Sequence, residues 1–252
     1  CMFKKNSQAP KNKININKWI FFELLKTKNI VEKNIKNYRF DEAARNVYQF
    51  VWHYYCDWYL ELSKTILYSN DKSAIKEVRE VSAFIFKEIL VLMHPFIPFV
   101  TEEIWLKNKL DNSGKNYLMY SNWIKGKIKK DNDHKEVEKV IDIISKIRSF
   151  KNELNVSPGS FIDVSLVKIN NKNKSFFKDN EIIFKKLGRI NNFFNEESDK
   201  SSASLVIGGN LFKIYFEESV DLNLIKENLI NKQRKYETEM SKINSRLKNK
   251  NF

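Results

Sequence analysis

The chain has 252 residues and 42% of them are hydrophobic, which is enough for a real core in one large or two modest domains. Only six Gly and four Pro are present, and this favours long helices over a loop-rich sheet protein. The excess of 45 basic over 31 acidic residues gives a net charge of +14, which suits nucleic acid or an anionic membrane surface as a partner. A Lys- and Asn-rich genome composition would also raise this charge. Two cysteines exclude a disulfide framework, and neither a secretory signal nor a membrane-spanning stretch is visible.

The first part of the chain predicts helices with short connections. Residues 1–13 are polar and Lys-rich and have no period. Over residues 17–35, apolar positions recur every three or four residues, as on one face of a helix. Asp41 is the expected N-cap of a second helix over residues 42–68, and Tyr48 falls within its apolar stripe.

A third and a fourth helix complete the predicted bundle. The turn at Asn70-Asp71 starts the third helix, and the two prolines of residues 94–98 end it. Pro98 or Thr101 opens the fourth helix. Four helices joined by short loops predict an antiparallel bundle over residues 1–125. Residues 111–131 are polar and Lys-rich, so they are expected to connect the bundle to a second domain.

The second domain is expected over residues 126–218 and mixes helices with strands. An amphipathic helix is indicated around residues 137–147. Residues 161–169 alternate as a strand does, and residues 181–187 fit a short helix. Residues 204–216 have the pattern of a β-hairpin with a glycine turn. The segment therefore predicts a small α/β domain.

The last segment, residues 219–252, has the heptad pattern of a coiled coil. One helix cannot bury such a seam alone, so a partner helix is required. The predicted fold class is mainly α: an antiparallel helix bundle, a small α/β domain and a C-terminal coiled-coil helix. The seam consists of residues seven positions apart: Leu222, Leu229, Tyr236 and Ile243.

No group of residues has the pattern of a catalytic or metal site. Gly208-Gly209 fits a hairpin turn better than a phosphate cradle. Glu102-Glu103 stand at the start of a helix, where acids interact with the macrodipole, so catalysis by this pair is not expected. His94 before a proline is expected to make a local hydrogen bond at a helix end. The three histidines lack partners at metal spacing, so neither a metal nor a cofactor is expected in this chain.

Basic and aromatic side chains in three places are candidates for RNA contact, by phosphate pairing and base stacking. Each has a plainer interpretation: Trp52 as bundle core, Arg45 and the pair at 148 and 151 as solvated charges, and the last group as an ordinary coiled-coil exterior. The candidates are Arg39, Arg45, Gln49 and Trp52 on or beside the second helix; Arg148 and Lys151; and Lys232, Arg234, Lys235, Lys242 and Arg246 on the final helix.

These residues resemble the valyl-tRNA synthetase family over about residues 19–252. The match to its anticodon-binding bundle includes Arg39-Phe40-Asp41, Phe50-Val51-Trp52 and the run Cys56-Asp57-Trp58-Tyr59-Leu60-Glu61, which separates it from the isoleucyl and leucyl enzymes. Residues 94–105 are shared more widely among class I synthetases. Residues 147–159, and Val220-Asp221-Leu222 with Leu247, resemble the segment after the bundle and the coiled-coil arm.

The chain departs from the family at three points. Ile124 stands where a proline usually follows the tryptophan, and Lys151 replaces a second arginine, losing its planar fork. The two class I active-site motifs and the editing domain are missing, so we expect truncation at both ends. The resemblance implies that a full-length enzyme joins valine to tRNA(Val) with ATP and Mg²⁺, while this fragment holds the anticodon and the tRNA body without catalysis.

The expected setting is a cytoplasmic monomer with tRNA(Val) as its partner and with neither DNA nor membrane. Two alternatives remain open at this point: a free-standing RNA-binding protein, and a structural or membrane-surface module that uses the basic coiled coil as an arm. An intact gene starting here favours the first, and vesicle binding that survives competing tRNA favours the second.

Overall fold

A computed structural model describes residues 10, 13–110, 117–124, 126, 128, 133–167, 171–194, 202–216 and 222–247. Contacts divide the chain into two compact units, Cys1–Ile141 and Asp142–Phe252. This limit falls inside helix α6 (Asp133–Glu153). The finer domain limits at 125/126 and 218/219 stay predictions. Below, each unit is described by itself.

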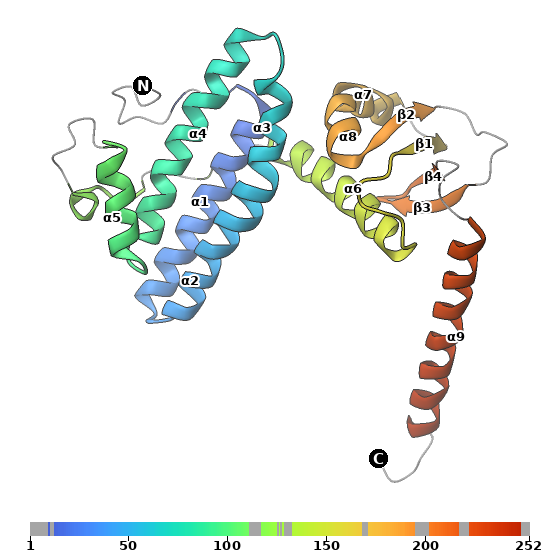
Figure 1. Ribbon diagram of the computed structural model, residues 1–252. Coiled ribbons are helices and arrows are strands. Elements are labelled where there is room, and N and C mark those ends of the chain that lie inside the picture. Colours follow the sequence, from blue (N-terminus) through green and yellow to red (C-terminus); the bar gives the residue numbers. More distant parts are fainter. Residues whose placement is uncertain are drawn as a thin grey trace. The chain divides into compact units, whose positions relative to one another are not determined.

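Within residues 13–110, the first unit consists of four helical rods that lie side by side (Figure 1). The second rod runs without a break through three elements. The four rods and their short connections confirm the predicted antiparallel bundle. The elements are α1 (Asn15–Lys36), α2 (Phe40–Gln49), η1 (Phe50–Tyr59), α3 (Leu60–Leu67), α4 (Lys72–Met93) and α5 (Pro98–Lys107), followed by the short helix η2 (Leu118–Tyr120).

The middle of the second rod is a π-helix rather than an α-helix. Its hydrogen bonds join residues five apart, as at its end, where the Leu60 amide donates to the Tyr55 carbonyl. Phe50, its first residue, is fully buried, whereas Tyr48 in the preceding α2 is 61% exposed. The prediction that Tyr48 faces the core was therefore wrong: α2 buries Ala43 and Val47, and Tyr48 lies outside that narrower face.

Helix starts were predicted correctly at two of three positions. Asp71 caps α4 by accepting hydrogen bonds from the amides of residues 73 and 74 at 2.9 and 3.0 Å. Pro98 is the first residue of α5, where its missing N–H is harmless. The prediction for Asp41 was wrong: α2 begins at Phe40, so Asp41 lies in its first turn. There its charge still interacts favourably with the helix macrodipole.

A polar network lies inside the bundle and joins three rods. Asn17 on α1 is fully buried, and its Oδ1 accepts a hydrogen bond of 2.9 Å from the Tyr59 hydroxyl. Burial raises the pKa of Tyr59 to about 12, so the hydroxyl is a donor at neutral pH. Ser82 on α4 donates to the same hydroxyl at 3.3 Å. The apolar core around this network includes Trp19, Ile20, Leu24, Leu62, Val78, Val81, Ile85 and Trp105.

The second unit contains a sheet with strand order β2-β1-β4-β3. Its strands are β1 (Ile162–Val167), β2 (Ile190–Phe194), β3 (Ala203–Ile207) and β4 (Asn210–Phe216). β1 and β2 run parallel, and the other pairs are antiparallel. The predicted hairpin is confirmed: Gly208 and Gly209 have φ of 55° and 76°, as a two-residue turn requires.

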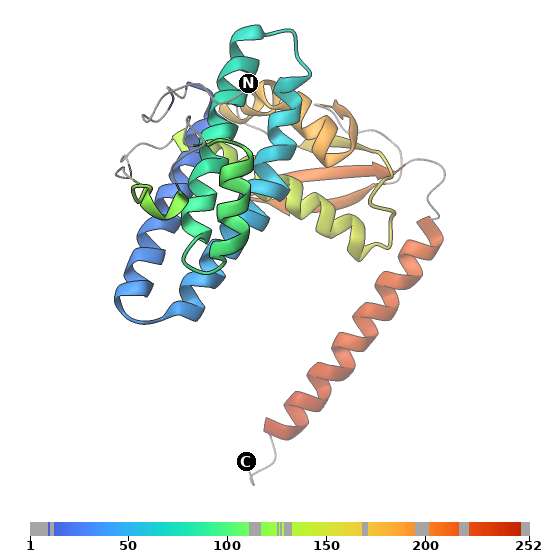
Figure 2. The same cartoon turned by 60° about the vertical axis from the view of Figure 1, so that its left-hand side comes forward.

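Helices α7 (Asn171–Asp179) and α8 (Glu181–Gly188) lie beside the sheet (Figure 2), and aromatic rings connect them to it. Phe177 and Phe184 contact Phe193 of β2, and Phe177 also contacts Phe212 of β4. α8 was predicted, but α7 and β2 were not. α7 is rich in Lys and Asn, β2 contains two Asn in five residues, and the paired Phe residues of each show no clear period.

The final helix α9 (Leu222–Leu247) confirms a helix at the predicted arm. Each of its side chains that the structure describes is exposed, including Leu229, Tyr236 and Ile243 of the predicted seam. The requirement for a partner helix therefore stays a prediction. Within the described residues, no helix is long and apolar enough to span a membrane.

Candidate nucleic-acid interface

Two aromatic rings stack on the outside of the bundle, where α2 passes into the π-helix. Tyr48 and Trp52 are 61% and 53% exposed, their ring centroids lie 6.2 Å apart, and their planes differ by 8°. The two residues are four positions apart, so their side chains meet on one helix face. A large apolar ring that is exposed and held by a neighbour costs little to order when another flat ring stacks on it.

Two arginines flank this aromatic pair on the same helix or just before it. Arg39 and Arg45 are both mostly exposed, and each lies near the Glu42 carboxylate, at 3.4 and 3.5 Å. At such exposure an ion pair is weak, so the carboxylate orients the guanidinium groups without neutralising them strongly. Gln49, between the two aromatic residues in sequence, is also exposed.

The loop before α2 and the first residue of α2 add two further exposed rings. Tyr38 has φ of 59°, a left-handed conformation that ends the α1 segment, and its side chain is 84% exposed. Its ring meets that of Phe40 edge to face, with centroids 6.4 Å apart. We define the bundle surface as Tyr38, Arg39, Phe40, Arg45, Tyr48, Gln49 and Trp52. It combines flat rings with cations, which together suit unpaired nucleotides.

Among the predicted candidates of the bundle, the structure excludes the plainer interpretation of Trp52. Trp52 is not core, because it is 53% exposed. Arg39, Arg45 and Gln49 are exposed as well, and for Arg45 this agrees with a solvated charge as much as with an RNA contact. Sequence reasoning missed Tyr38, Phe40 and Tyr48, although the first two directly flank Arg39 and the third lies one turn before Trp52. For Tyr48 the signal was its spacing of four residues from Trp52, which places the two rings on one helix face.

The second pair of candidates has structural roles. Lys151 is 2% exposed, and its ammonium donates to the backbone carbonyls of Ser160 and Pro158. It therefore stabilises the loop after α6, and we leave it out of the proposed RNA surface, since a buried ammonium cannot reach a phosphate. Arg148 donates two hydrogen bonds to the Leu187 carbonyl, at 3.1 and 2.8 Å, which fixes α6 to the end of α8.

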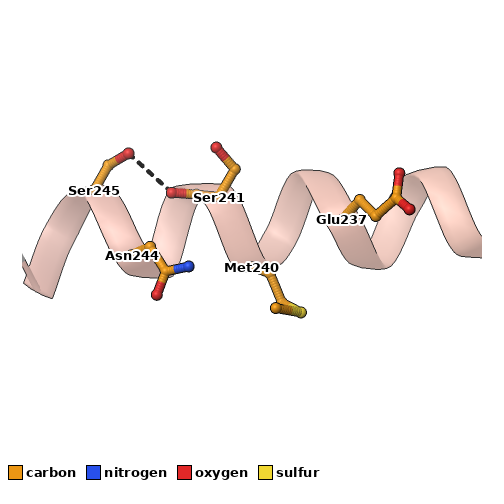
Figure 3. A pocket seen from close by; sticks show the side chains of 5 residues that line it. All are labelled: Glu237, Met240, Ser241, Asn244 and Ser245. Atoms are coloured by element: carbon orange, nitrogen blue, oxygen red, sulfur yellow. Dashed lines mark hydrogen bonds between the residues drawn. The ribbon is translucent and has the colours of Figure 1, made fainter.

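The candidates on α9 lie on an exposed helix. Arg234, Lys235, Lys242 and Arg246 are exposed, whereas the side chain of Lys232 lies outside the described residues. Figure 3 shows the side chains that line a pocket on this helix, and the dashed line marks the hydrogen bond from Ser245 Oγ to the Ser241 carbonyl, which is 2.8 Å long. A single helix face lines this pocket, so it is an open surface rather than a substrate cavity. The lining residues are Glu237, Met240, Ser241, Asn244 and Ser245.

Two groups with the residue types of a catalytic site have local partners instead. His94 Nδ1 lies 2.8 Å from Thr101 Oγ1, so this side chain ties the end of α4 to the start of α5, as expected for a helix-end residue. Glu102 accepts a hydrogen bond of 2.7 Å from the Leu118 amide, and Glu103 pairs with Lys107 at 2.8 Å. Over the part of the chain that the structure describes, no cluster of three or more His, Cys, Asp or Glu is placed to hold a metal.

The first unit is thus a helix bundle that carries stacked aromatic rings and cations on one rod, features that suit contact with nucleic acid. The chain belongs to the family of anticodon-binding domains of tRNA ligases, whose model matches residues 17–166. That range contains the whole bundle surface and extends through α6 into β1.

Curated relatives extend this likeness over nearly the whole chain. The chain is 61% identical to the valine--tRNA ligase of Pelagibacter ubique over 252 residues, which are 100% of this chain and 29% of that protein. It is 31% identical to the valine--tRNA ligase of Bartonella quintana, over 96% of this chain and 27% of the relative. For Rhizobium meliloti the identity is 32%, over 95% and 25%. The chain thus spans less than a third of the length of each of these relatives.

Proposed function

We propose that this chain is the tRNA(Val)-binding C-terminal region of a valine--tRNA ligase, a cytoplasmic monomer that attaches valine to tRNA(Val). Support comes from the match of the whole of this chain to 29% of one such ligase and from the anticodon-binding family model. The ATP and Mg²⁺ used by the whole enzyme would bind elsewhere, because the residues of this chain include no glycine-rich phosphate loop. No catalytic step is assigned to this chain.

The bundle surface is proposed to hold the anticodon. The observation that carries this proposal is the stacked, exposed pair of Tyr48 and Trp52 beside Arg39 and Arg45. Anticodon bases are unpaired, so their faces are free to stack on such rings and their phosphates to pair with guanidinium groups. The exposed basic residues of α9 would contact the tRNA body by charge alone.

The contribution of these contacts to the rate would be positional. Binding energy far from the reacting atoms is used to place the acceptor end of the tRNA in the distant catalytic site. Misplacement by a substitution on the bundle would therefore lower kcat/KM of the whole ligase for tRNA, while leaving the activation of valine by ATP unchanged.

Binding of this chain to tRNA(Val), with its native or a changed anticodon, at two salt concentrations tests the proposal. We expect a preference for the native anticodon that persists at the higher salt, because stacking and base contacts are less salt-sensitive than phosphate contacts. Equal and strongly salt-sensitive binding to both RNAs would leave only attraction by net charge, and the anticodon role would be withdrawn.

A pair of matched variants then locates the surface. Trp52→Ala should weaken binding of tRNA(Val) by roughly ten- to a hundredfold, since stacking of one base contributes about 1–3 kcal/mol. Tyr120→Ala is the control, because Tyr120 is also exposed, at 74% against 53% for Trp52, but lies on η2 rather than on α2 or η1. Equal reductions in affinity for the two variants would contradict the assignment to α2 and η1.

A further inference from the structure

A second group of exposed apolar side chains lies at α5 and η2, outside the bundle surface. Phe99 is 89% exposed and Tyr120 74%, and Val100, Tyr117 and Met119 are each more than half exposed. We call these five residues the α5–η2 surface. Single exposed apolar residues are common, but several large ones on neighbouring elements mark an interaction site.

The α5–η2 surface is held in place by polar contacts beneath it. Thr101 is buried and lies within hydrogen-bonding distance of His94, which fixes the first turn of α5 to the end of α4. Glu102 binds the Leu118 amide, and the Leu118 side chain is buried, which fixes η2 beside α5. Both ribbon views place η2 next to α5 (Figures 1 and 2).

Phe99 lies on the side of α5 that is turned towards η2. Phe99 and Glu102 are three residues apart, so they lie on one face of α5, and Glu102 reaches the backbone of η2. Because the backbone of both elements is already fixed, docking does not have to order it when the exposed side chains are covered.

The charges around this surface disfavour RNA as its partner. Glu102 and Glu103 lie in the turn next to Phe99, and over the described ranges 94–110 and 117–124 the basic residues are Lys107 and Lys109. Lys107 is paired with Glu103. Acidic groups repel phosphates, whereas the bundle surface contains Arg39 and Arg45. An apolar protein surface is the partner that fits.

We propose that the α5–η2 surface docks onto an apolar face of the remaining part of a longer valine--tRNA ligase. The P. ubique relative has 71% of its length outside the match, the complement of the 29% that this chain covers, so ample protein surface is available. This inference rests on the proposed function in one respect only, that the chain works within a longer ligase. It does not depend on which surface holds the tRNA.

Oxidative footprinting with hydroxyl radicals tests the docking. This chain alone is compared with a chimera in which its 252 residues replace the matching segment of the P. ubique ligase. We expect oxidation of Phe99, Met119 and Tyr120 to fall about tenfold in the chimera, because labelling follows the accessible area that an interface removes. Tyr48 and Trp52 are internal controls, and their labelling should stay unchanged until tRNA(Val) is added.

The outcomes separate the competing partners. Equal labelling of the α5–η2 surface in chain and chimera overturns the proposal. So does protection that grows with the concentration of the isolated chain, which indicates a second copy, or protection by tRNA(Val) alone, which indicates RNA. Footprinting the unmodified P. ubique ligase at its aligned positions repeats the test if the chimera does not assemble. Failure of tRNA to protect Tyr48 and Trp52 would instead count against the proposed function.

Discussion

At the scale of single residues, Glu77 organises the start of the bundle. Its Oε1 accepts hydrogen bonds from the amides of Lys13 and Ile14 at 2.8 and 3.0 Å and from Asn17 Nδ2 at 2.9 Å. A carboxylate of α4 therefore satisfies the free amides at the N-terminus of α1. Burial alone would raise the pKa of Glu77, but these hydrogen bonds outweigh burial and lower it.

We predict that Glu77→Gln lowers the free energy of unfolding by about 1–2 kcal/mol at pH 7, since the variant no longer makes hydrogen bonds through a charged group. The folded-state pKa is below the ordinary 4.5, so this stability is present above that value and is lost as the pH falls through the lowered pKa. Urea unfolding across pH measures it. Glu80→Gln is the control on the same helix, because Glu80 lies 4.0 Å from Lys76 in an exposed ion pair. Equal losses of unfolding free energy in the two variants would refute the role of Glu77 at the start of α1.

Glu88 on α4 makes the stability of the protein depend on pH in the opposite direction. Burial raises its pKa to about 7, and Lys87 opposes this only in part. Folding is therefore favoured most below pH 4.5 and loses stability as the pH rises towards 7. Glu88→Gln should stabilise the protein above pH 7, by at most about 3 kcal/mol for a shift of this size.

Unfolding of the wild type and the Glu88→Gln variant at pH 5 and pH 8 measures this effect. The difference in unfolding free energy between the two proteins should grow with pH. A difference that is the same at both pH values would show that Glu88 is ionised in both, with no raised pKa. Because all five tryptophans lie in the first unit, their fluorescence reports the unit that contains Glu88.

At the scale of elements, the aspartates at the starts of α4 and α2 should differ in their contribution to stability, because only Asp71 caps its helix. Asp71→Ala should cost about 1 kcal/mol, because two amides at the start of α4 lose their acceptor. Asp41→Ala should cost less than about 0.5 kcal/mol, since only an exposed charge near the α2 dipole is removed. Thermal unfolding of both variants measures the difference. The reverse ranking would mean that the caps are misassigned.

The π-helix marks the limit of pattern reading for the second rod. The run of aromatic residues from Phe50 to Tyr59 clearly predicts a helix, but not its pitch. Pitch depends on how Phe50, Tyr55 and Tyr59 fit between neighbouring rods, which is a property of packing. Tyr48 lies in α2, before the change of pitch, and its exposure beside Trp52 follows from where the neighbouring rods pack. The geometry of the candidate site is therefore a property of tertiary structure.

At the scale of the whole molecule, the charge of +14 and the bundle surface should have separable effects on tRNA binding. Changing Arg234, Lys235, Lys242 and Arg246 together to Gln should weaken binding to native and altered tRNA alike. The slope of log affinity against log salt should fall in magnitude by roughly 0.7–0.9 for each phosphate that the variant no longer neutralises. The anticodon preference should remain.

Filter binding over a salt series measures this slope. The control changes four exposed lysines of the first unit, Lys64, Lys72, Lys76 and Lys107, to Gln, which removes the same charge from other places. Equal slopes for the two quadruple variants would mean that net charge, and not the face of α9, attracts the RNA.

The sequence by itself determined the helix bundle, the hairpin at Gly208-Gly209, the terminal helix and the family. These features depend on local rules, namely apolar period, capping and turn residues, and on the specific run from Cys56 to Glu61. Only the tertiary structure decided that Lys151 is buried beneath a loop, that α7 and β2 exist, and that Tyr48 and Trp52 stack outside the bundle. Burial and helix pitch are set by neighbours distant in sequence, which no local pattern contains.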